Sequence, residues 1–208
     1  MTDADARRAI AADVSRETLS RLDTYHALLL KWQVTVNLVS PATLDAIWSR
    51  HFLDSLQLLP ATERHQKTWV DLGSGAGFPG LVCAIAAQDL PEKVSFSLIE
   101  SDTRKCAFLQ EVSRATDTPI TIHNARAESV PPLRAQIVSA RALAPLPRLL
   151  PLVHRHVAHE GTSLLQKGMR YAQELELARR DWQMDVDVLQ SATDVDAVIL
   201  RFRNLTYA

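Results

Sequence analysis

Glycines gather at one point of this sequence. Four of the six glycines lie within eight residues, at Gly73, Gly75, Gly77 and Gly80. Glycine adopts backbone conformations that are closed to other residues, and it lets a ligand approach the main chain closely. Between a strand and a helix, such a turn directs backbone N–H groups at the polar groups of a ligand. The cluster therefore predicts a cofactor site at the carboxyl end of a parallel strand, where the strand order reverses.

The spacing of these residues fits two classes of cofactor. Residues 75–80 match the G-x-G-x-x-G pattern of dinucleotide enzymes, and Glu100 follows at the distance of a ribose-binding acid. Residues 73–77 match the G-x-G-x-G pattern of methyltransferases, with Asp71 as the preceding acid. Both cofactors carry a ribose diol, which the Glu100 carboxylate can bind in either case. The predicted strand 69–72 runs directly into Gly73, so the turn begins at the first glycine of the methyltransferase pattern. This starting point of the turn favours S-adenosylmethionine over NAD.

Alternating strand and helix patterns surround the glycine turn. Residues 1–66 are predicted to be helical, with apolar residues at steps of three and four over residues 19–32. From residue 67 onward, short apolar runs alternate with helical patterns, which indicates βαβ units and a parallel sheet. We therefore predict an α/β fold in two parts, an N-terminal helical segment (residues 1–66) packed on a core of residues 67–208.

The apolar patterns place seven strands in the core. The last two predicted strands have no helix between them, which favours a hairpin and one antiparallel strand in a mostly parallel sheet. The predicted strands are residues 69–72, 94–99, 119–122, 137–139, 162–166, 186–189 and 195–202. The predicted helices are residues 47–56, after a Ser40-Pro41 cap, and residues 81–87, 103–115, 146–157 and 171–182.

Composition and charge limit the possible functions. The 208 residues are 47% hydrophobic and 23% charged, which is typical of a globular protein and excludes a disordered chain. No apolar run approaches the roughly 20 residues that span a bilayer, and the N-terminus lacks a signal-peptide core, so we expect a soluble cytoplasmic protein with no membrane partner.

The net charge is −1, but residues 136–180 carry seven basic and three acidic side chains. This stretch is a candidate surface for a polyanion, although an ordinary solvated surface would give the same count.

The histidines and cysteines do not indicate a metal site. His154, His156 and His159 do not share one helical face, and two cysteines cannot form a four-cysteine zinc site. Cys83 and Cys106 lie in apolar helical contexts, where packing is the simplest role. We therefore predict neither metal binding nor a cysteine nucleophile.

Further motifs accompany the glycine turn along about residues 19–203. They are Trp32 with Asn37-Leu38, Arg50-His51-Phe52-Leu53-Asp54-Ser55, Leu98-Ile99-Glu100-Ser101, Asn124-Ala125-Arg126-Ala127-Glu128, Ser139-Ala140-Arg141-Ala142 and Gln166-Lys167-Gly168. Together with the run Asp71–Gly80, in which Pro79-Gly80 is especially specific, these motifs resemble the RsmG (GidB) family of bacterial 16S ribosomal RNA methyltransferases. The sequence departs from the family in one motif, where Ala140 is inserted before the arginine.

The resemblance implies a fold, a reaction and a substrate. The fold is a Rossmann-like, seven-stranded class I methyltransferase sheet, mixed but mostly parallel, with an N-terminal helical extension. The reaction is transfer of the methyl group of S-adenosylmethionine to N7 of one guanine, position 527, in 16S ribosomal RNA, within the small ribosomal subunit or an assembly intermediate. Guanine N7 has a lone pair and no hydrogen, so its methylation needs no general base.

The resemblance also assigns residues to a site. It places Gly73, Phe78, Ala127, Glu128 and Arg141 at the cofactor, beside Asp71, Gly75, Gly77 and Glu100, which the glycine pattern already marks. Arg141 is the candidate for positioning the substrate, and a structural ion pair with Glu128 or Asp71 is the alternative. For contacts with the RNA we expect Arg50, His51, Lys167 and Arg170. An NAD-dependent oxidoreductase and a non-catalytic nucleotide-binding module stay open as alternatives.

Overall fold

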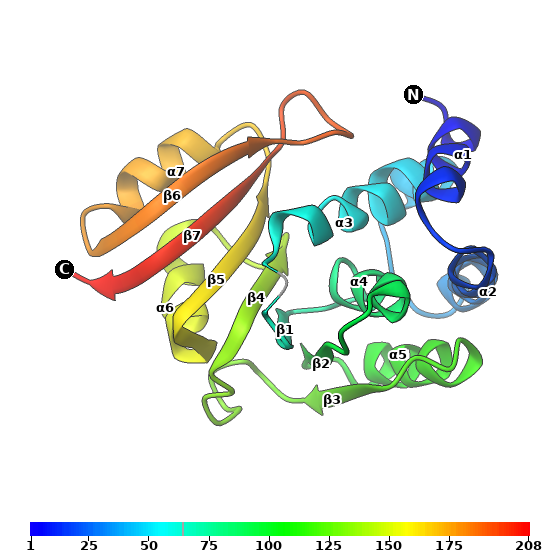
Figure 1. Ribbon diagram of the computed structural model, residues 1–208, viewed down its shortest axis with the longest axis horizontal. Coiled ribbons are helices and arrows are strands. Elements are labelled where there is room, and N and C mark those ends of the chain that lie inside the picture. The colour runs from blue at the N-terminus through cyan, green and yellow to red at the C-terminus, as the bar shows by residue number, and fades with distance from the viewer. Residues whose placement is uncertain (64) are drawn as a thin grey trace.

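A twisted sheet of seven strands forms the centre of the computed structural model, which describes residues 1–63 and 65–208 (Figure 1). The strands are β1 (Thr68–Leu72), β2 (Ser95–Glu100), β3 (Ile120–Asn124), β4 (Ala135–Arg141), β5 (Val157–Lys167), β6 (Trp182–Gln190) and β7 (Val198–Tyr207). β1 to β5 pair in parallel, whereas β7 pairs antiparallel with β5 and β6. The mixed sheet and the closing hairpin are confirmed.

The strand order is β3-β2-β1-β4-β5-β7-β6, so the direction of winding reverses between β1 and β4. In parallel sheets of this kind, ligands bind beyond the carboxyl ends of the strands at the point of reversal. The glycine turn begins there, directly after Leu72, and β4 ends beside it at Arg141. The fold thus brings together two of the motifs that the sequence singled out.

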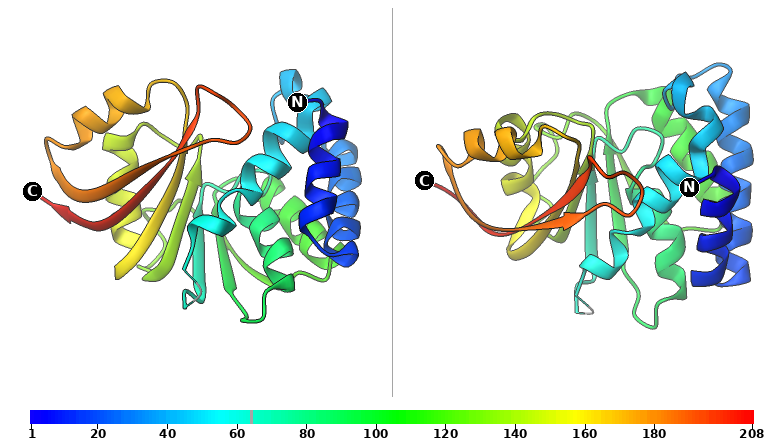
Figure 2. Two further views of the ribbon diagram at one scale, coloured as in Figure 1. Left: turned by 45° about the horizontal axis from the view of Figure 1, so that its top comes forward. Right: turned by 90° about the horizontal axis from the view of Figure 1, so that it is seen from above.

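Helices cover both faces of the sheet (Figures 1 and 2). A hydrophobic core lies on each face of the sheet, and alternate residues of β1 belong to one or the other. Trp69 packs with α4 and α5, and Val70 packs with α6 and α7. This alternation follows from the period of two along a strand, so a strand buried on both faces is apolar throughout. The helices of the core are α4 (Gly80–Ala86), η4 (Ala87–Asp89), α5 (Thr103–Ala115), α6 (Leu146–His156) and α7 (Tyr171–Ala178).

The N-terminal segment packs on the same side as α4 and α5 (Figure 2). Leu22 and Leu29 of its long helix join the hydrophobic cluster that contains Trp69 and Phe108. One cluster therefore spans both predicted parts, and the division after residue 66 stays a prediction. The segment consists of α1 (Asp3–Asp13), α2 (Arg16–Gln33), η1 (Pro41–Ala46), η2 (Trp48–Leu53), α3 (Asp54–Leu56) and η3 (Leu59–Ala61). Among the helices described, none is both long enough and apolar enough to cross a bilayer.

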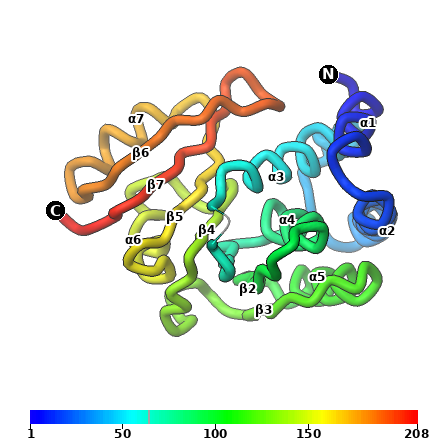
Figure 3. The backbone as a smooth tube through the Cα atoms, viewed as in Figure 1, coloured from blue at the N-terminus to red at the C-terminus, as the bar shows by residue number. Residues whose placement is uncertain are grey.

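Some predicted elements differ from the structure. The predicted helix 47–56 is a π-helical turn followed by the short α3, and Ser40 makes no side-chain cap. The predicted helix 171–182 ends early, because Trp182 is buried at the start of β6, where it packs against Tyr207. Val195 is not in a strand: it is 88% exposed in the loop before β7. This β6–β7 loop reaches α3, where the Ala192 N–H donates to the Gln57 side chain (Figure 3).

Candidate active site

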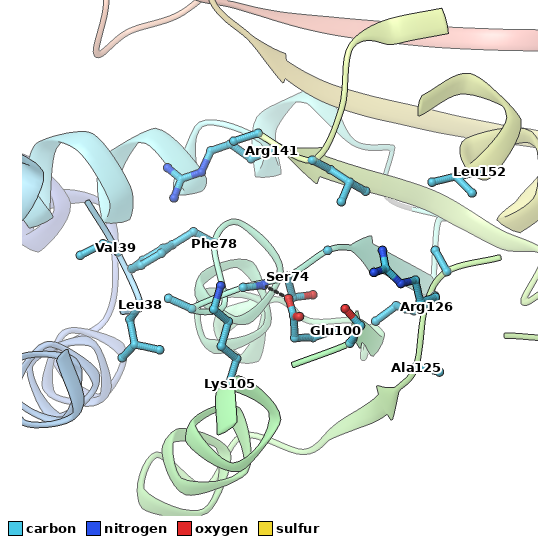
Figure 4. Close-up of a pocket in the computed structure, with 18 of the residues that line it drawn as sticks. Leu38, Val39, Ser74, Phe78, Glu100, Lys105, Ala125, Arg126, Arg141 and Leu152 are labelled. Carbon is cyan, nitrogen blue, oxygen red and sulfur yellow. Dashed lines mark hydrogen bonds between the residues drawn. The ribbon is translucent and has the colours of Figure 1, made fainter. Parts of the chain in front are cut away.

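The turn after β1 owes its shape to glycines in the left-handed region. Gly73, Gly75 and Gly77 have φ values of +64°, +57° and +96°, which side chains with a Cβ rarely adopt. At Gly75 an added Cβ would have only the Gly73 carbonyl oxygen nearby, at 3.8 Å, so this side of the turn is open. The Gly75 N–H donates to Oε2 of Glu100 at 2.8 Å and joins the turn to the end of β2 (Figure 4).

A cavity of about 390 Å³ opens beside this turn (Figure 4). Its size is within the range of roughly 300 to 1,000 Å³ that small-molecule sites occupy. Most of the residues expected at the cofactor line it, namely Gly73, Gly75, Phe78, Glu100, Ala127, Glu128 and Arg141. Sequence reasoning missed a further set of lining residues, from loops and from α5 and α6, which includes Leu38, Val39, Ser74, Lys105, Arg126, Leu143 and Leu152.

Two residues expected at the cofactor, Asp71 and Gly77, lie outside this cavity. Asp71 is fully buried, and its Oδ1 accepts a hydrogen bond from the Ser139 hydroxyl at 2.6 Å. Gly77 faces the interior, where an added Cβ would collide with the Tyr25 hydroxyl and lie 2.9 Å from Cβ of Leu81. Both residues support the turn from within the protein and do not line the ligand side.

Asp71 is expected to make stability depend on pH. Burial raises its pKa from 3.8 to about 6, so the native state holds a proton that the unfolded chain releases. The resulting stability is fully present below pH 3.8 and is lost as the pH rises through 6; the shift corresponds to about 3 kcal/mol. Relative to the non-titrating variant Asp71→Asn, the wild type should lose about this much unfolding free energy between pH 4 and 7, measured by urea titration. If the unfolding free energies of the two proteins changed with pH in parallel, this expectation would be contradicted.

A second cavity of about 610 Å³ adjoins the first. His51, Arg141, Ala142 and Leu143 line both cavities and therefore form the passage between them. The second cavity also has Arg50 and Lys167 in its wall, whereas Arg170 lies outside it, exposed before α7. Three of the four residues expected to contact RNA thus surround one cavity.

The N-terminal segment holds Arg141 at the passage. The Arg141 guanidinium donates to the Arg50 carbonyl oxygen at 3.0 Å, to the Asp54 carboxylate at 3.1 Å and to Nδ1 of His51 at 2.9 Å. It also lies over the ring of Phe78, 5.1 Å from its centre (Figure 4). These contacts fix the side chain in one orientation between the cavities.

Arg141 does form an ion pair, as the alternative expected, but its partner is Asp54, so the expected partners Glu128 and Asp71 are wrong. Asp54 lies 87 residues away in the chain, and its side chain is only 15% exposed. Its side chain also accepts hydrogen bonds from Gln57, Gln166 and Thr193. Asp54 therefore links α3, β4, β5 and the β6–β7 loop around the second cavity.

His51 is a neutral part of the passage. Burial, and then the charges of Arg141 and Arg50, lower its pKa to about 3. Because its Nδ1 accepts from Arg141, its Nε2 carries the hydrogen and donates to the Thr43 hydroxyl at 2.9 Å. The imidazole stacks on Phe78 with 4.9 Å between ring centres. His51 therefore presents a flat ring at the passage, and it carries no positive charge that could bind an RNA phosphate.

Besides Arg141, two cations stand in the wall of the second cavity, and both already have partners. Arg50 pairs with Asp194 at 2.6 Å, and its side chain is 49% exposed. The ammonium group of Lys167 donates to the Ala144 carbonyl oxygen and to the Glu174 carboxylate, and this side chain is only 10% exposed. Arg50 is therefore accessible to an incoming anion, whereas Lys167 is largely enclosed.

The cysteines and the three neighbouring histidines do not line either cavity. Cys83 and Cys106 are buried free thiols, and burial raises the pKa of Cys83. Within residues 1–63 and 65–208, no three side chains of the metal-binding types gather into a group. His154 instead packs against Trp182, with 5.4 Å between ring centres.

Comparison with known proteins identifies relatives over the whole length of the chain. The model of the GidB family, described as rRNA small subunit methyltransferase G, matches residues 18–201. A ribosomal RNA small subunit methyltransferase G of Jannaschia sp. (strain CCS1) is 45% identical over 203 residues, which cover 98% of this chain and 96% of the relative. The protein of the same name from Rhodospirillum centenum is 50% identical over 195 residues, or 94% and 88% of the two chains.

Solved structures share the fold at much lower identity. A SAM-dependent methyltransferase from Aquifex aeolicus aligns with a TM-score of 0.58 and 12% identity over 80% of this chain and 94% of the other. A variant of MtNAS in complex with S-adenosylmethionine aligns with a TM-score of 0.60 and 14% identity over 88% and 74%. These likenesses show the Rossmann-like methyltransferase fold. The family match and the close relatives together show that this chain belongs to the rRNA small subunit methyltransferase G (GidB) family.

Proposed function

We propose that this protein transfers the methyl group of S-adenosylmethionine to N7 of guanine 527 in 16S ribosomal RNA. The observation that carries the proposal is the pair of adjoining cavities at the reversal of strand order. One lies against the glycine turn, and the other opens past Arg141 toward the basic part of the chain. Membership of the family supports ribosomal RNA as the substrate and the cytoplasm, where ribosomal subunits assemble, as the place of action.

The residues of the first cavity fit S-adenosylmethionine, which supplies an electrophilic methyl group on a sulfonium when it is bound. The open side of Gly75 lets a ligand approach the backbone. Glu100 already accepts one backbone N–H on each carboxylate oxygen, from Gly75 and Asp102, and its remaining lone pairs can accept the ribose hydroxyls. Ala127 and Glu128 line the cavity and are proposed to lie at the adenine.

The side chains at the passage suit a methylation that is driven by positioning. Guanine N7 attacks without losing a proton, so the protein needs to align the base and to exclude water. The base gains positive charge in the reaction. Arg141 has its charge balanced by Asp54, and His51 is neutral, so neither adds an uncompensated cation beside the product.

Exposed arginines at the start of α6 and just before α7 are proposed to contact RNA phosphates. Arg148 of α6 and Arg170, which precedes α7, are both exposed. Arg50 is proposed to exchange Asp194 for a phosphate, because an exposed ion pair contributes only about 0 to 1 kcal/mol. The bulk of the RNA affinity is therefore expected to be electrostatic and to fall with salt.

Reversing the charge of Arg170 should affect the RNA and not the cofactor. We expect Arg170→Glu to raise the KM for small subunits roughly tenfold, because one phosphate contact becomes a repulsion. The dissociation constant for S-adenosylmethionine should not change. Steady-state kinetics and calorimetry measure the two quantities. Arg114→Glu, an exposed change at the end of α5, is the matched control and should leave both unchanged; equal losses of RNA and cofactor binding in Arg170→Glu would contradict the assignment.

The proposal is tested by methyl transfer from labelled S-adenosylmethionine. Small subunits that lack the modification and protein-free 16S RNA are incubated with the protein, and the RNA is digested to nucleosides. Labelled 7-methylguanosine from the subunits supports the proposal, and the free RNA shows whether ribosomal proteins are required. Calorimetric binding of NAD without binding of S-adenosylmethionine would favour the oxidoreductase, and tight cofactor binding without transfer would favour the binding module.

A further inference from the structure

The loop between β4 and α6, residues 142–145, lies at the passage between the two cavities. Its residues Ala142 and Leu143 line both of them. The Leu143 side chain packs over the glycine turn, so closely that a Cβ on Gly73 would lie 2.6 Å from Cδ1 of Leu143. Ala142 has a φ of +54°, a conformation that costs energy for a residue with a Cβ. A strained loop in this place needs contacts that hold it.

One ion pair supplies such contacts from outside the loop. The Lys167 ammonium donates to the Ala144 carbonyl oxygen at 2.7 Å and to Oε2 of Glu174 at 2.8 Å. The same Oε2 accepts the Leu146 N–H, the first amide of α6, at 2.9 Å. The pair therefore binds one backbone group near each end of the bend from 144 to 146.

The pair of Lys167 and Glu174 is too enclosed to serve mainly as a contact for RNA phosphates. The Lys167 side chain is 10% exposed and that of Glu174 is 24% exposed, so water screens the pair less than it screens a surface pair. Two of the three ammonium hydrogens are already donated within the protein. Arg170, three residues further along the chain, is exposed instead.

We infer that Glu174 and Lys167 are positioning residues that hold residues 142–146 in place at the passage between the cofactor cavity and the substrate cavity. The inference rests on the proposed function of this site, and it gives Lys167 a role other than the phosphate contact expected from the sequence. Glu174 lines the second cavity, and its proposed role is exerted through Lys167 and the Leu146 amide, which it holds. Loss of either partner should let Ala144 and Leu143 shift, which misplaces the base relative to the methyl group.

The first test compares Glu174→Gln, Lys167→Met and the combined variant on small subunits. Each single change should lower kcat about tenfold or more, because small misplacements are costly in reactions that depend on alignment. The combined variant should be no slower than the slower single variant, since both changes remove one shared interaction. The dissociation constant for S-adenosylmethionine should change less than threefold. Glu176→Gln, an exposed change on the same helix, is the matched control with wild-type activity.

The salt dependence of KM separates positioning from phosphate binding. If Lys167 only positions the loop, the slope of log KM against log salt should be the same in Lys167→Met and in the wild type. A direct phosphate contact would lower this slope by about 0.7 to 0.9. A lowered slope in Lys167→Met together with normal kcat in Glu174→Gln would overturn the inference.

Amide hydrogen exchange tests the same inference without any substrate. The Leu146 amide is bonded to Glu174, so its exchange should be at least tenfold faster in folded Glu174→Ala, which removes the acceptor, than in the wild type. Unchanged exchange in Glu174→Ala would overturn the inference. If the wild type transfers no methyl group while the Leu146 amide responds as expected, the proposed function fails and the positioning of the loop stands.

Discussion

Replacing Glu100 by alanine should weaken the binding of S-adenosylmethionine by about a hundredfold or more. Glu100 is only 8% exposed and lines the cofactor cavity, where its carboxylate is proposed to accept two ribose hydroxyls. Hydrogen bonds to charged groups contribute about 1.5 to 3 kcal/mol each, and about 1.4 kcal/mol corresponds to a tenfold change. The variant also leaves the Gly75 and Asp102 amides without their acceptor, which loosens the turn. Isothermal titration calorimetry measures the effect.

Two further variants test whether the loss of affinity in Glu100→Ala is specific to this carboxylate. Glu100→Gln keeps one acceptor oxygen and should have an intermediate affinity. Glu111→Ala removes a partly exposed carboxylate on α5, paired with Arg114, and should bind the cofactor as the wild type does. A dissociation constant for Glu100→Ala within threefold of the wild type would show that Glu100 does not bind the ribose.

Replacing Arg141 by alanine should reduce kcat for methyl transfer about a hundredfold or more, with a smaller loss of cofactor affinity. The guanidinium lies where both cavities meet and makes three hydrogen bonds across the passage. Without it, the largely buried Asp54 carboxylate loses its cation, and His51 loses the donor that orients its ring. Misplacement by about 1 Å costs an enzyme of this kind on the order of a hundredfold.

Lysine should not restore the activity of the Arg141 variant. A single ammonium cannot reproduce the planar fork of an arginine that donates to His51 and Asp54 together. Arg104→Ala, an exposed change at the start of α5, is the control for a general loss of positive charge. If Arg141→Ala leaves both methyl transfer and cofactor affinity unchanged, the assignment of this site is wrong.

The fold could largely be predicted from the sequence, because its signals are local. Helix α5 was predicted at its observed bounds, and the structure shows Asp102 as its N-cap, which accepts the first free amides. The closing hairpin followed from the lack of a helix between β6 and β7. Helix α1 was not predicted individually, since its boundaries depend on a capping box between Thr2 and Asp5 and on packing against η2.

The site was predictable where backbone geometry defines it. The glycines and Glu100 belong to one strand–turn–helix unit and its neighbouring strand, so their spacing locates the cofactor cavity. The placement of Asp71 could also have been found from the sequence, because the period of two along β1 puts it on the same face as Trp69, under α4.

Other parts of the site depend on contacts between distant segments. Asp54 meets Arg141 across 87 residues, and Thr193 meets Asp54 across 139. Glu174 reaches Leu146 from the next helix of the same face. No local pattern marks these residues, since each is an ordinary polar residue within its own element and gains its role only when the sheet assembles.

The most direct measurement of the central claim is the position of the methyl group in the RNA. Small subunits without the modification are methylated by the protein, and the 16S RNA is mapped by cleavage at 7-methylguanine. We predict one new cleavage site, at guanine 527, which is absent after treatment with Arg141→Ala. A methyl group on another base, or on another atom of this guanine, would contradict the account.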